Sequence, residues 1–331
     1  MSEPSGEAAH EFRHEPVMRE RIVDLFGAVP PGWVVDATVG GGGHARAILE
    51  AHEHLRVLGL DQDEMALTAA AERLEPFGDR VRLHRSRFDA LDDIVDQLAT
   101  TPVSGVLFDL GVSSPQLDRA DRGFSFRHDG PLDMRMDQRQ ARSAAEIVNE
   151  TDERELAGIL RAFGDERFAS RIAKAIVARR PVHTTGELAE IVRDAIPAPA
   201  RRRGGHPAKR TFQAIRIAVN AELDILPIAI DAGLAALQPG GRCAVLSYHS
   251  GEDRIVKDRF RHAATGGWKG PAHLPPPSDV HPTVRLLKAG AWTPTDAEVE
   301  TNPRAASARL RAAEKLDHPA DATTAEPQAP R

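Results

Sequence analysis

Apolar and polar positions alternate in two ways along the chain. Over the first third, four short runs rich in β-branched residues begin at Trp33, Arg56, Val81 and Val103, and a segment of helical composition such as EMALTAAAERL separates each run from the next. This alternation predicts strands connected by helices, and therefore a parallel sheet that helices cover on both faces. After a long interval the pattern resumes, and a QPGG turn followed by RCAVLSYH, then SARLRAAEKL from Ser307, is expected to complete the sheet.

Between Gln116 and Pro207 the periodicity is helical, and no run favours a strand. One set of apolar residues recurs at helical spacing, which predicts a buried helix face. The set consists of Leu156, Ile159, Leu160 and Phe163. A helical stretch of this size exceeds an ordinary loop and approaches a small domain. We therefore predict an all-helical substrate-recognition domain inserted into an α/β core.

These patterns divide the chain into predicted parts. The inserted helical domain covers residues 116–207, and the α/β core covers 13–115 and 208–316. The polar ends, 1–12 and 317–331, are predicted to be disordered. Proline and glycine are frequent in GGWKGPAHLPPPSDVHP, which predicts an irregular loop over residues 266–283.

Composition narrows the class of protein. The 331 residues carry a formal net charge of −6, which argues against a uniformly basic surface that coats nucleic acid, so any contact with RNA must be local. The single cysteine, Cys243, cannot form an intrachain disulfide and excludes a zinc site built from cysteines. The start MSEPSGEAAHE lacks the features of a signal peptide, and no apolar run approaches the roughly 20 residues of a membrane span. We expect a soluble, cytoplasmic protein.

Acidic residues fall at the ends of three predicted strands. Asp36 lies at the end of the first strand, Asp61 ends the second and Asp109 ends the fourth. In open α/β sheets, ligands bind beyond the carboxyl ends of the strands. The three carboxylates are therefore expected to face one crevice.

Four consecutive glycines, Gly40 to Gly43, follow the first strand. Such a turn lets the backbone approach a ligand closely, and the helix start beyond it favours negative charge. A nicotinamide-binding turn would have a further glycine where Arg46 stands, whereas enzymes that use S-adenosylmethionine carry an acidic residue, here Asp36, before a short glycine-rich turn. Asp61 lies at the spacing expected for a ribose-binding acid. The pattern favours S-adenosylmethionine over a dinucleotide, and a tight turn without a ligand is the third alternative.

Longer blocks extend this interpretation over nearly the whole chain. The blocks are DATVGGGGHARAIL, FDLGVSSPQLDRADRGFSFRHDGPLDMRMD, GDERFASRIAKAIV, KRTFQAIRIAVNAEL, SYHSGEDRIVK and NPRAASARLRAAEK. From about Glu15 to Leu316, they resemble the bacterial 16S ribosomal RNA cytosine-N4 methyltransferase family, known as RsmH or MraW. The resemblance implies a Rossmann-like class I S-adenosylmethionine-dependent methyltransferase with an inserted all-helical domain. One departure is Gly251, where the family pattern SxHSLEDR has leucine.

The resemblance also implies which residues bind S-adenosyl-L-methionine. They are Gly42, Gly43, His44, Asp61, Phe88, Asp109 and Gln116. For His44, a ring in solvent with contact through the backbone N–H is an equal alternative. The residue types suit this task, because Asp61 can accept hydrogen bonds from both ribose hydroxyls and Phe88 offers an apolar wall for the adenine. Gly40 and Gly41 are then the expected turn formers. No metal ion is implied.

The implied reaction is N4-methylation of a specific cytosine in the decoding region of 16S rRNA, with the small ribosomal subunit as partner. The amine is a poor nucleophile because its lone pair is delocalised into the ring, so the enzyme must orient it and a group must accept a proton. Asp109 is the candidate for orienting the methyl donor or the amine. His249 is the second catalytic candidate, through contact with the base or its phosphate, and a purely structural role for it is an equal alternative.

Contact with RNA requires local positive charge. The run RRRGGHPAKR, from Arg201 to Arg210, is the densest basic segment where the insertion rejoins the core. Arg167, Arg171 and Lys174 share one helix face by their spacing. We predict that both groups contact phosphate, and for the run 201–210 a solvated or disordered surface is the alternative.

The segment 122–137, RGFSFRHDGPLDMRMD, mixes aromatic and charged residues directly after the predicted donor site. Phe124 and Phe126 are predicted to line a base pocket, where aromatic faces stack a splayed-out nucleotide. A place in the core of the helical domain is the alternative. Two other functions also stay open: a non-catalytic ribosome-assembly or RNA-binding factor and, less favoured, a nicotinamide-dependent oxidoreductase.

Overall fold

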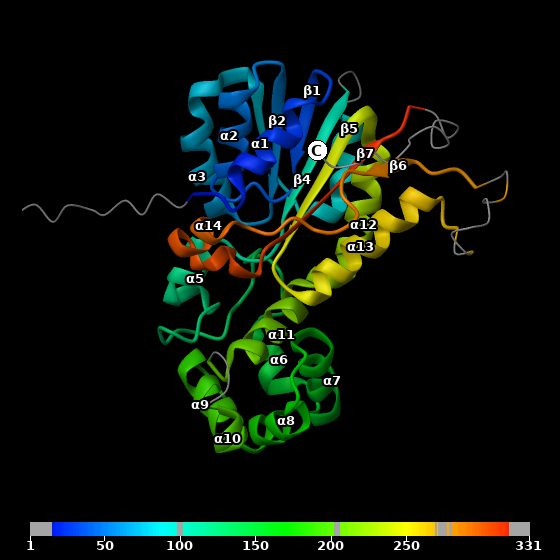
Figure 1. Cartoon of the computed structure of the whole chain (residues 1–331). Coiled ribbons are helices and arrows are strands. Elements are labelled where there is room, and N and C mark those ends of the chain that lie inside the picture. Colours follow the sequence, from blue (N-terminus) through cyan, green and yellow to red (C-terminus); the bar gives the residue numbers. More distant parts are fainter. Residues whose placement is uncertain are drawn as a thin grey trace, which may run out of the picture.

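A seven-stranded sheet forms the centre of the molecule (Figure 1). The computed structural model describes residues 15–97, 102–201, 206–268, 270, 277 and 280–317. The strands are β1 (Gly32–Asp36), β2 (Leu55–Asp61), β3 (Val81–Arg85), β4 (Val103–Asp109), β5 (Leu237–Ser247), β6 (Val284–Leu286) and β7 (Arg309–Lys315). They lie in the order β3-β2-β1-β4-β5-β7-β6. The α/β class predicted from the sequence is confirmed.

Strands β1 to β5 are parallel, as the alternation of the first third predicted. Strand β7 runs antiparallel to both β5 and β6. The sequence pattern locates an apolar run but does not give its direction, because a strand covered on both faces is apolar in either orientation. Strand β6 has only three residues, so its pattern was too short to detect.

Strand β5 begins before the run from which it was predicted. The expected QPGG turn lies inside the strand, at an irregularity where Val103 pairs with Leu237 but Gly105 pairs with Arg242. Gly240 has a φ of +76°, in the left-handed region that favours glycine. The turn is therefore a bulge that accommodates extra residues within the strand.

Helices cover both faces of the sheet. Helices α1 (Arg19–Gly27), α2 (Gly43–Ala51) and α3 (Glu64–Leu74) pack on one face, and α4 (Leu91–Gln97), α12 (Glu222–Ala236) and α13 (Ser250–Thr265) on the other. Successive residues of a strand point to opposite faces, so Val34 belongs to the first hydrophobic cluster and Val35 to the second. Because both faces are buried, the strand reads as a continuous apolar run.

The chain from α5 to α11, between β4 and α12, forms a separate helical part (Figure 1). It contains α5 (Ser114–Asp118), α6 (Ala144–Glu150), α7 (Glu153–Gly164), α8 (Ala169–Ala178), α9 (Thr185–Ala195), α10 (Ala198–Arg201) and α11 (Lys209–Asn220). Among its described residues, β pairing is limited to an isolated bridge between Pro131 and Thr184. Helices α6 and α7 are separate because Asp152 accepts a hydrogen bond from the Glu155 N–H (2.9 Å) and starts a new helix.

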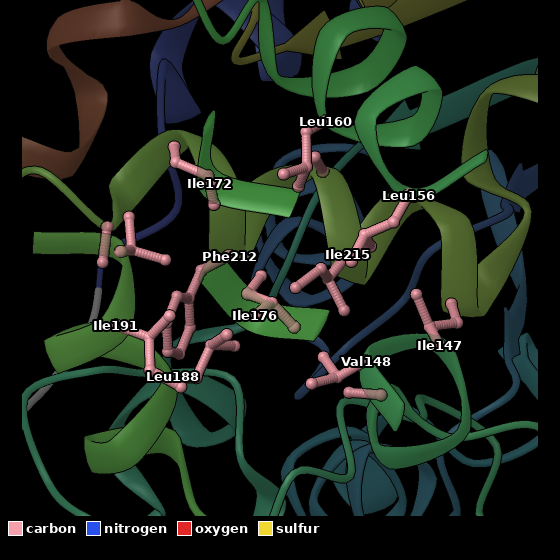
Figure 2. Close-up of a cluster of buried hydrophobic side chains, with 14 of the residues drawn as sticks. Ile147, Val148, Leu156, Leu160, Ile172, Ile176, Leu188, Ile191, Phe212 and Ile215 are labelled. Atoms are coloured by element: carbon pink, nitrogen blue, oxygen red, sulfur yellow. The ribbon is translucent and has the colours of Figure 1, made fainter. Parts of the chain in front are cut away.

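The helical part has its own hydrophobic core (Figure 2). Leu156 and Leu160 are fully buried in it, while Ile159 and Phe163 pack against it and are partly exposed, so the predicted stripe is confirmed. Phe212 and other residues of α11 belong to the same cluster. The cluster thus takes in a helix that the sequence assigned to the α/β core.

The remaining elements lie around the sheet. They are α14 (Asp296–Thr301) and the 3-10 helices η1 (Glu75–Arg80), η2 (Phe88–Ala90), η3 (Ala120–Arg122) and η4 (Pro303–Ser307). The predicted disorder at 1–12 and beyond 317 lies outside the described residues, as does part of the predicted loop 266–283. Within the described part of the chain, no helix combines the length and apolar character needed to cross a bilayer.

Candidate active site

The connections of the sheet change direction between β1 and β4. The chain passes from β1 outward to β3 on one side and from β4 to β5 on the other. In open α/β sheets this switch point is where ligands bind, beyond the carboxyl ends of the strands. Asp36, Asp61 and Asp109 are the last residues of β1, β2 and β4. The strand positions therefore place all three carboxylates at the edge of the sheet where a ligand is expected.

The glycine run joins β1 to α2. Gly40 and Gly42 have φ values of +51° and +77°, so these two positions need glycine for backbone conformation. Gly42 is also the residue before the first turn of α2, and an added Cβ there would lie 3.2 Å from the Leu74 Cγ. Gly41 has no positive φ, and a Cβ would meet only ordinary contacts. Gly40 and Gly41 are nevertheless the two central residues of the turn, which the Gly42 N–H closes by donating to the Val39 carbonyl (2.8 Å), so their assignment as turn formers is confirmed.

Asp61 holds the glycine turn in place. Its Oδ2 accepts a hydrogen bond from the Gly40 N–H (2.9 Å), and its Oδ1 accepts one from the Asp63 N–H (2.9 Å). Burial raises the pKa of the Asp61 carboxyl to about 6, although both hydrogen bonds act in the opposite direction. Each carboxylate oxygen has a second lone pair, so Asp61 can still accept hydrogen bonds from a ligand.

Asp36, His44 and Asp109 form a second group of polar side chains. Burial raises the pKa of Asp36 to about 7; a charged His44 lowers it, and the Asp109 charge raises it. His44 is only 6% exposed, and its Nε2 lies 3.4 Å from the Asp109 Oδ2. Neither ring nitrogen of His44 makes a hydrogen bond with a described residue. Buried polar atoms without partners are rare, so these nitrogens are available for a ligand.

Tyr248 is part of the site, and the sequence analysis missed it. It follows β5 directly, and its hydroxyl donates a hydrogen bond to the Asp109 Oδ1 (2.7 Å). The Asp109 backbone N–H donates to the Thr38 Oγ1 (2.6 Å), which joins the ends of β1 and β4. The sequence contains one tyrosine, and it directly follows the predicted strand that became β5. Because β5 lies next to β4, which ends at Asp109, this position could have indicated the contact.

Gln116 lies in a buried polar cluster beside the glycine turn. Its side chain caps α5 by accepting from the Ser113 N–H (3.0 Å), and its amide donates to the Asp63 Oδ2 (2.9 Å). The Arg122 guanidinium reaches the same oxygen at 2.8 Å, and the two charged side chains are 2% and 6% exposed. A buried ion pair of this kind requires both partners, because either charge alone is costly. The cluster therefore fixes the segment after α5 against the start of α3.

Phe88 is placed where the third strand has ended. It begins η2, is partly buried, and packs edge to face on Phe108 with ring centroids 6.0 Å apart. Phe108 precedes Asp109 on β4. The ring therefore gives the switch point an apolar side.

His249 caps helix α13. Its Nδ1 accepts a hydrogen bond from the Glu252 N–H (3.4 Å), and the Glu252 carboxylate accepts one in return from the His249 N–H (3.2 Å). This is the reciprocal arrangement of a capping box. A Cβ at Gly251 would lie 3.1 Å from the His249 Nδ1, so the glycine leaves room for the cap. The cap gives His249 a structural role; its buried Nε2 lies 3.0 Å from the Glu252 Oε1 and makes no hydrogen bond with a described residue, so the catalytic role stays a prediction.

The two aromatic residues predicted to line a base pocket lie in the helical core. Phe124 is 5% exposed, and Phe126 is partly buried, stacked on His206 at 4.1 Å and edge-on to Phe212 at 5.4 Å. Their faces are occupied by other side chains, so the prediction that they stack a nucleotide is wrong for this conformation. The charged residues next to these rings in the sequence suggested a base pocket, but the rings pack with apolar residues of the helical core instead.

The structure describes only part of the basic residues that were predicted to contact phosphate. Residues 202–205 of the run 201–210 lie outside the described residues, and Arg210 donates to the Asp165 carbonyl (3.0 Å). Arg167, Arg171 and Lys174 are exposed, but the prediction that they share one helix face is wrong for Arg167, because α8 begins only at Ala169. Within the described ranges, none of these three forms an ion pair. Their charges are therefore available to an anionic partner.

The geometry is suited to a cationic ligand. Several carboxylates at one partly shielded edge lower the energy of a positive charge there. A positively charged ligand would also offset the free-energy cost of keeping the Asp36 carboxylate ionised while it is buried. A dinucleotide would instead bring a negatively charged pyrophosphate to the same place.

Comparisons with known proteins cover nearly the whole chain. The sequence model of the MraW methylase family matches residues 11–316. The ribosomal RNA small subunit methyltransferase H of Mycobacterium sp. (strain KMS) is 54% identical over 318 residues, covering 92% of this chain and 84% of that protein. The protein of the same name from Thermobifida fusca (strain YX) is 52% identical over 325 residues, covering 96% and 98%. An rRNA methylase structure from Streptococcus thermophilus aligns with a TM-score of 0.41 at 13% identity, covering 91% and 98%. The match over nearly the whole chain shows that this protein belongs to the MraW methylase family.

Proposed function

We propose that this enzyme transfers a methyl group from S-adenosylmethionine to N4 of a cytosine in the decoding region of 16S rRNA. Family membership supports the methyl-transfer chemistry, and the names of the relatives support small-subunit ribosomal RNA as the substrate. The observation that carries the proposal is the convergence of Asp36, Asp61 and Asp109 with an unpartnered His44 at the switch point of the sheet. The sequence resemblance supplies the finer choice of cytosine N4.

The residues present fit S-adenosylmethionine, which supplies an electrophilic methyl group on a sulfonium when it is bound. Gly42 caps α2 and Gly43 and His44 begin it, where free backbone N–H groups can donate hydrogen bonds to a carboxylate. Asp61 is assigned to the ribose hydroxyls, and Phe88 to one side of the adenine. Buried nitrogens of His44 that lack partners indicate that the site is incomplete without a ligand.

Asp109 is assigned to orientation of the reacting amine. Its side chain is 27% exposed, so a ligand can reach it, and its carboxylate can accept a hydrogen bond from N4. Acceptance of one amine hydrogen raises the electron density on N4 and fixes the orientation of the amine relative to the methyl group. Gln116 is assigned to the donor site by resemblance, and its hydrogen bond to Asp63, which in turn donates its N–H to Asp61, supports this assignment.

The helical part is proposed to recognise the RNA. Arg167, Arg171 and Lys174 offer exposed positive charge to phosphates, and such contacts position a nucleic acid without reading its sequence. Asp165, beside this group, accepts a hydrogen bond from the Ser250 hydroxyl (3.1 Å), at the start of α13. This contact joins the end of α7 to the start of α13, in the α/β part.

The test is transfer of labelled methyl from S-adenosylmethionine to naked 16S rRNA, free small subunits and whole ribosomes, followed by mapping of the modified base. Label on a cytosine N4 of the decoding region is the expected result. RNA binding without any label would instead identify a non-catalytic assembly factor. Label on another atom or another RNA would retain the family chemistry and reject the proposed target.

A further inference from the structure

Tyr248 connects the ends of two neighbouring strands through Asp109. Its hydroxyl donates to the Asp109 Oδ1 at 2.7 Å. Burial, followed by the charge of Asp109, raises the pKa of the Tyr248 hydroxyl well above its ordinary value. The phenol therefore keeps its proton and remains a hydrogen-bond donor to this carboxylate.

The position of the Tyr248 ring is fixed by the scaffold. Its backbone N–H donates to the Glu252 Oε2 (2.7 Å), the same carboxylate that completes the capping box of α13. The ring packs against the hydrophobic cluster that contains Leu246 and Leu310. On the other side it lies close to Gly111, where a Cβ would be 3.7 Å from the Tyr248 Cδ2. The hydroxyl therefore has little freedom to leave Asp109.

The two oxygens of Asp109 have different surroundings. Oδ1 is engaged by Tyr248, whereas Oδ2 lies 3.4 Å from the His44 Nε2 without a hydrogen bond to it. The terminal torsion of an aspartate is broad and has no strong intrinsic preference. A bond to one oxygen therefore determines the direction of the other.

We infer that Tyr248 is a positioning residue, whose hydroxyl holds Asp109 so that Oδ2 faces the reacting amine. This inference rests on the proposed function. Tyr248 acts only through Asp109 and contacts neither the substrate nor the donor. Loss of the hydroxyl lets the carboxylate rotate, and a misplaced orienting group reduces the rate of transfer more than the binding of the donor.

The test is a double-mutant cycle of Tyr248→Phe and Asp109→Ala, with labelled methyl transfer to small subunits as the readout. In the wild-type background, Tyr248→Phe is expected to lower kcat about 10- to 100-fold and to leave the KM for S-adenosylmethionine within about threefold. In the Asp109→Ala background it should have no further effect, because the residue through which it acts is absent. Asp109→Asn is used as a second background in the same cycle. If the rate of the alanine variant is below detection, the effect of Tyr248→Phe is compared in the asparagine variant instead.

Ser247→Ala is the matched control. It removes a buried hydroxyl one residue away, which donates to the Arg309 carbonyl (3.3 Å) and does not touch Asp109, so kcat should be that of the wild type. An equal loss from Tyr248→Phe in both backgrounds, or no loss in the wild-type background, would overturn the inference. Absence of transfer by the wild-type enzyme would instead reject the proposed function.

Discussion

Asp36 shows how a single buried carboxylate sets a pH dependence for the whole protein. Its pKa rises from 3.8 to about 7 on folding, chiefly through burial. Between these two values the folded protein retains a proton that the unfolded chain has lost. The stability contributed by this group is therefore complete below pH 4 and is lost as the pH rises through about 7.

We expect Asp36→Asn to stabilise the ligand-free protein at pH 8. The amide imitates the protonated acid, so the free energy of unfolding should increase by about 2–4 kcal/mol at pH 8 and change little at pH 4. Urea unfolding over this pH range measures both values. The exposed Asp24→Asn is the control and should leave the pH dependence intact. A decrease in stability at pH 8 would show that the Asp36 charge is compensated in the folded protein.

For single residues, the sequence predicted which residues lie at strand ends, but it did not predict which side chains contact each other. Asp36, Asp61 and Asp109 could be placed because each ends a strand, and parallel strands have their carboxyl ends at one edge. The bond from Tyr248 to Asp109 depends on strand order, which pairs β4 with β5. Phe124 was misplaced because an apolar ring beside charged residues suits a base pocket and a domain core equally well.

At the scale of elements, α13 depends on an unusual cap. Histidine at the cap position uses its Nδ1 to accept the Glu252 N–H, as serine or asparagine does more often. Loss of a cap costs about 0.5–2 kcal/mol of stability. His249 and Tyr248 share the Glu252 carboxylate, so the cap also supports the positioning of Tyr248.

His249→Ala is therefore expected to lower the free energy of unfolding by about 1 kcal/mol. His249→Asn should restore it, because the asparagine oxygen can accept the same N–H. Urea unfolding and methyl transfer are measured on the wild type and both variants. We expect turnover to recover with stability in the asparagine variant. Recovery of stability alone would show that the imidazole contacts the substrate.

Elements in the interior of the fold were predicted well, whereas their boundaries and directions were not. The four strands of the first third have continuous apolar runs because both faces of the sheet are covered. The bulge in β5 and the antiparallel β7 arise from pairing with neighbours distant in sequence. Such pairing leaves no periodic signal within the strand itself.

At the scale of the whole molecule, the helical part is tied to the α/β part beside the candidate site. Arg122 bonds to Asp63 at the start of α3, and the Asn220 Oδ1 accepts the Met136 N–H (2.9 Å) at the end of α11. The segment 122–137 therefore lies between the two hydrophobic cores. RNA held by the helical part would have a fixed relation to the strand ends.

The basic group on the helical part provides the last prediction. Substitution of Arg167, Arg171 and Lys174 by glutamate should weaken binding of small subunits strongly. The slope of log K against log salt concentration should become shallower by about 2–3, because three fewer phosphate contacts release three fewer sets of counterions. Binding is measured between 50 and 300 mM salt, roughly the range in which such contacts are decisive. Helix α8 should remain folded, because Arg171 and Lys174 are exposed on it, Arg167 precedes it, and its buried face is unchanged.

A second triple variant separates local contact from net charge. Arg254, Lys257 and Arg261 repeat the three- and four-residue spacing on an exposed face of α13, in the α/β part. Their reversal to glutamate changes the net charge of the protein by the same amount. An equal loss of affinity from both variants would indicate a non-specific effect of charge, because long-range repulsion depends on the total. A loss confined to the variant of the helical part would locate the RNA there, since screening over about 10 Å limits each charge to nearby phosphates.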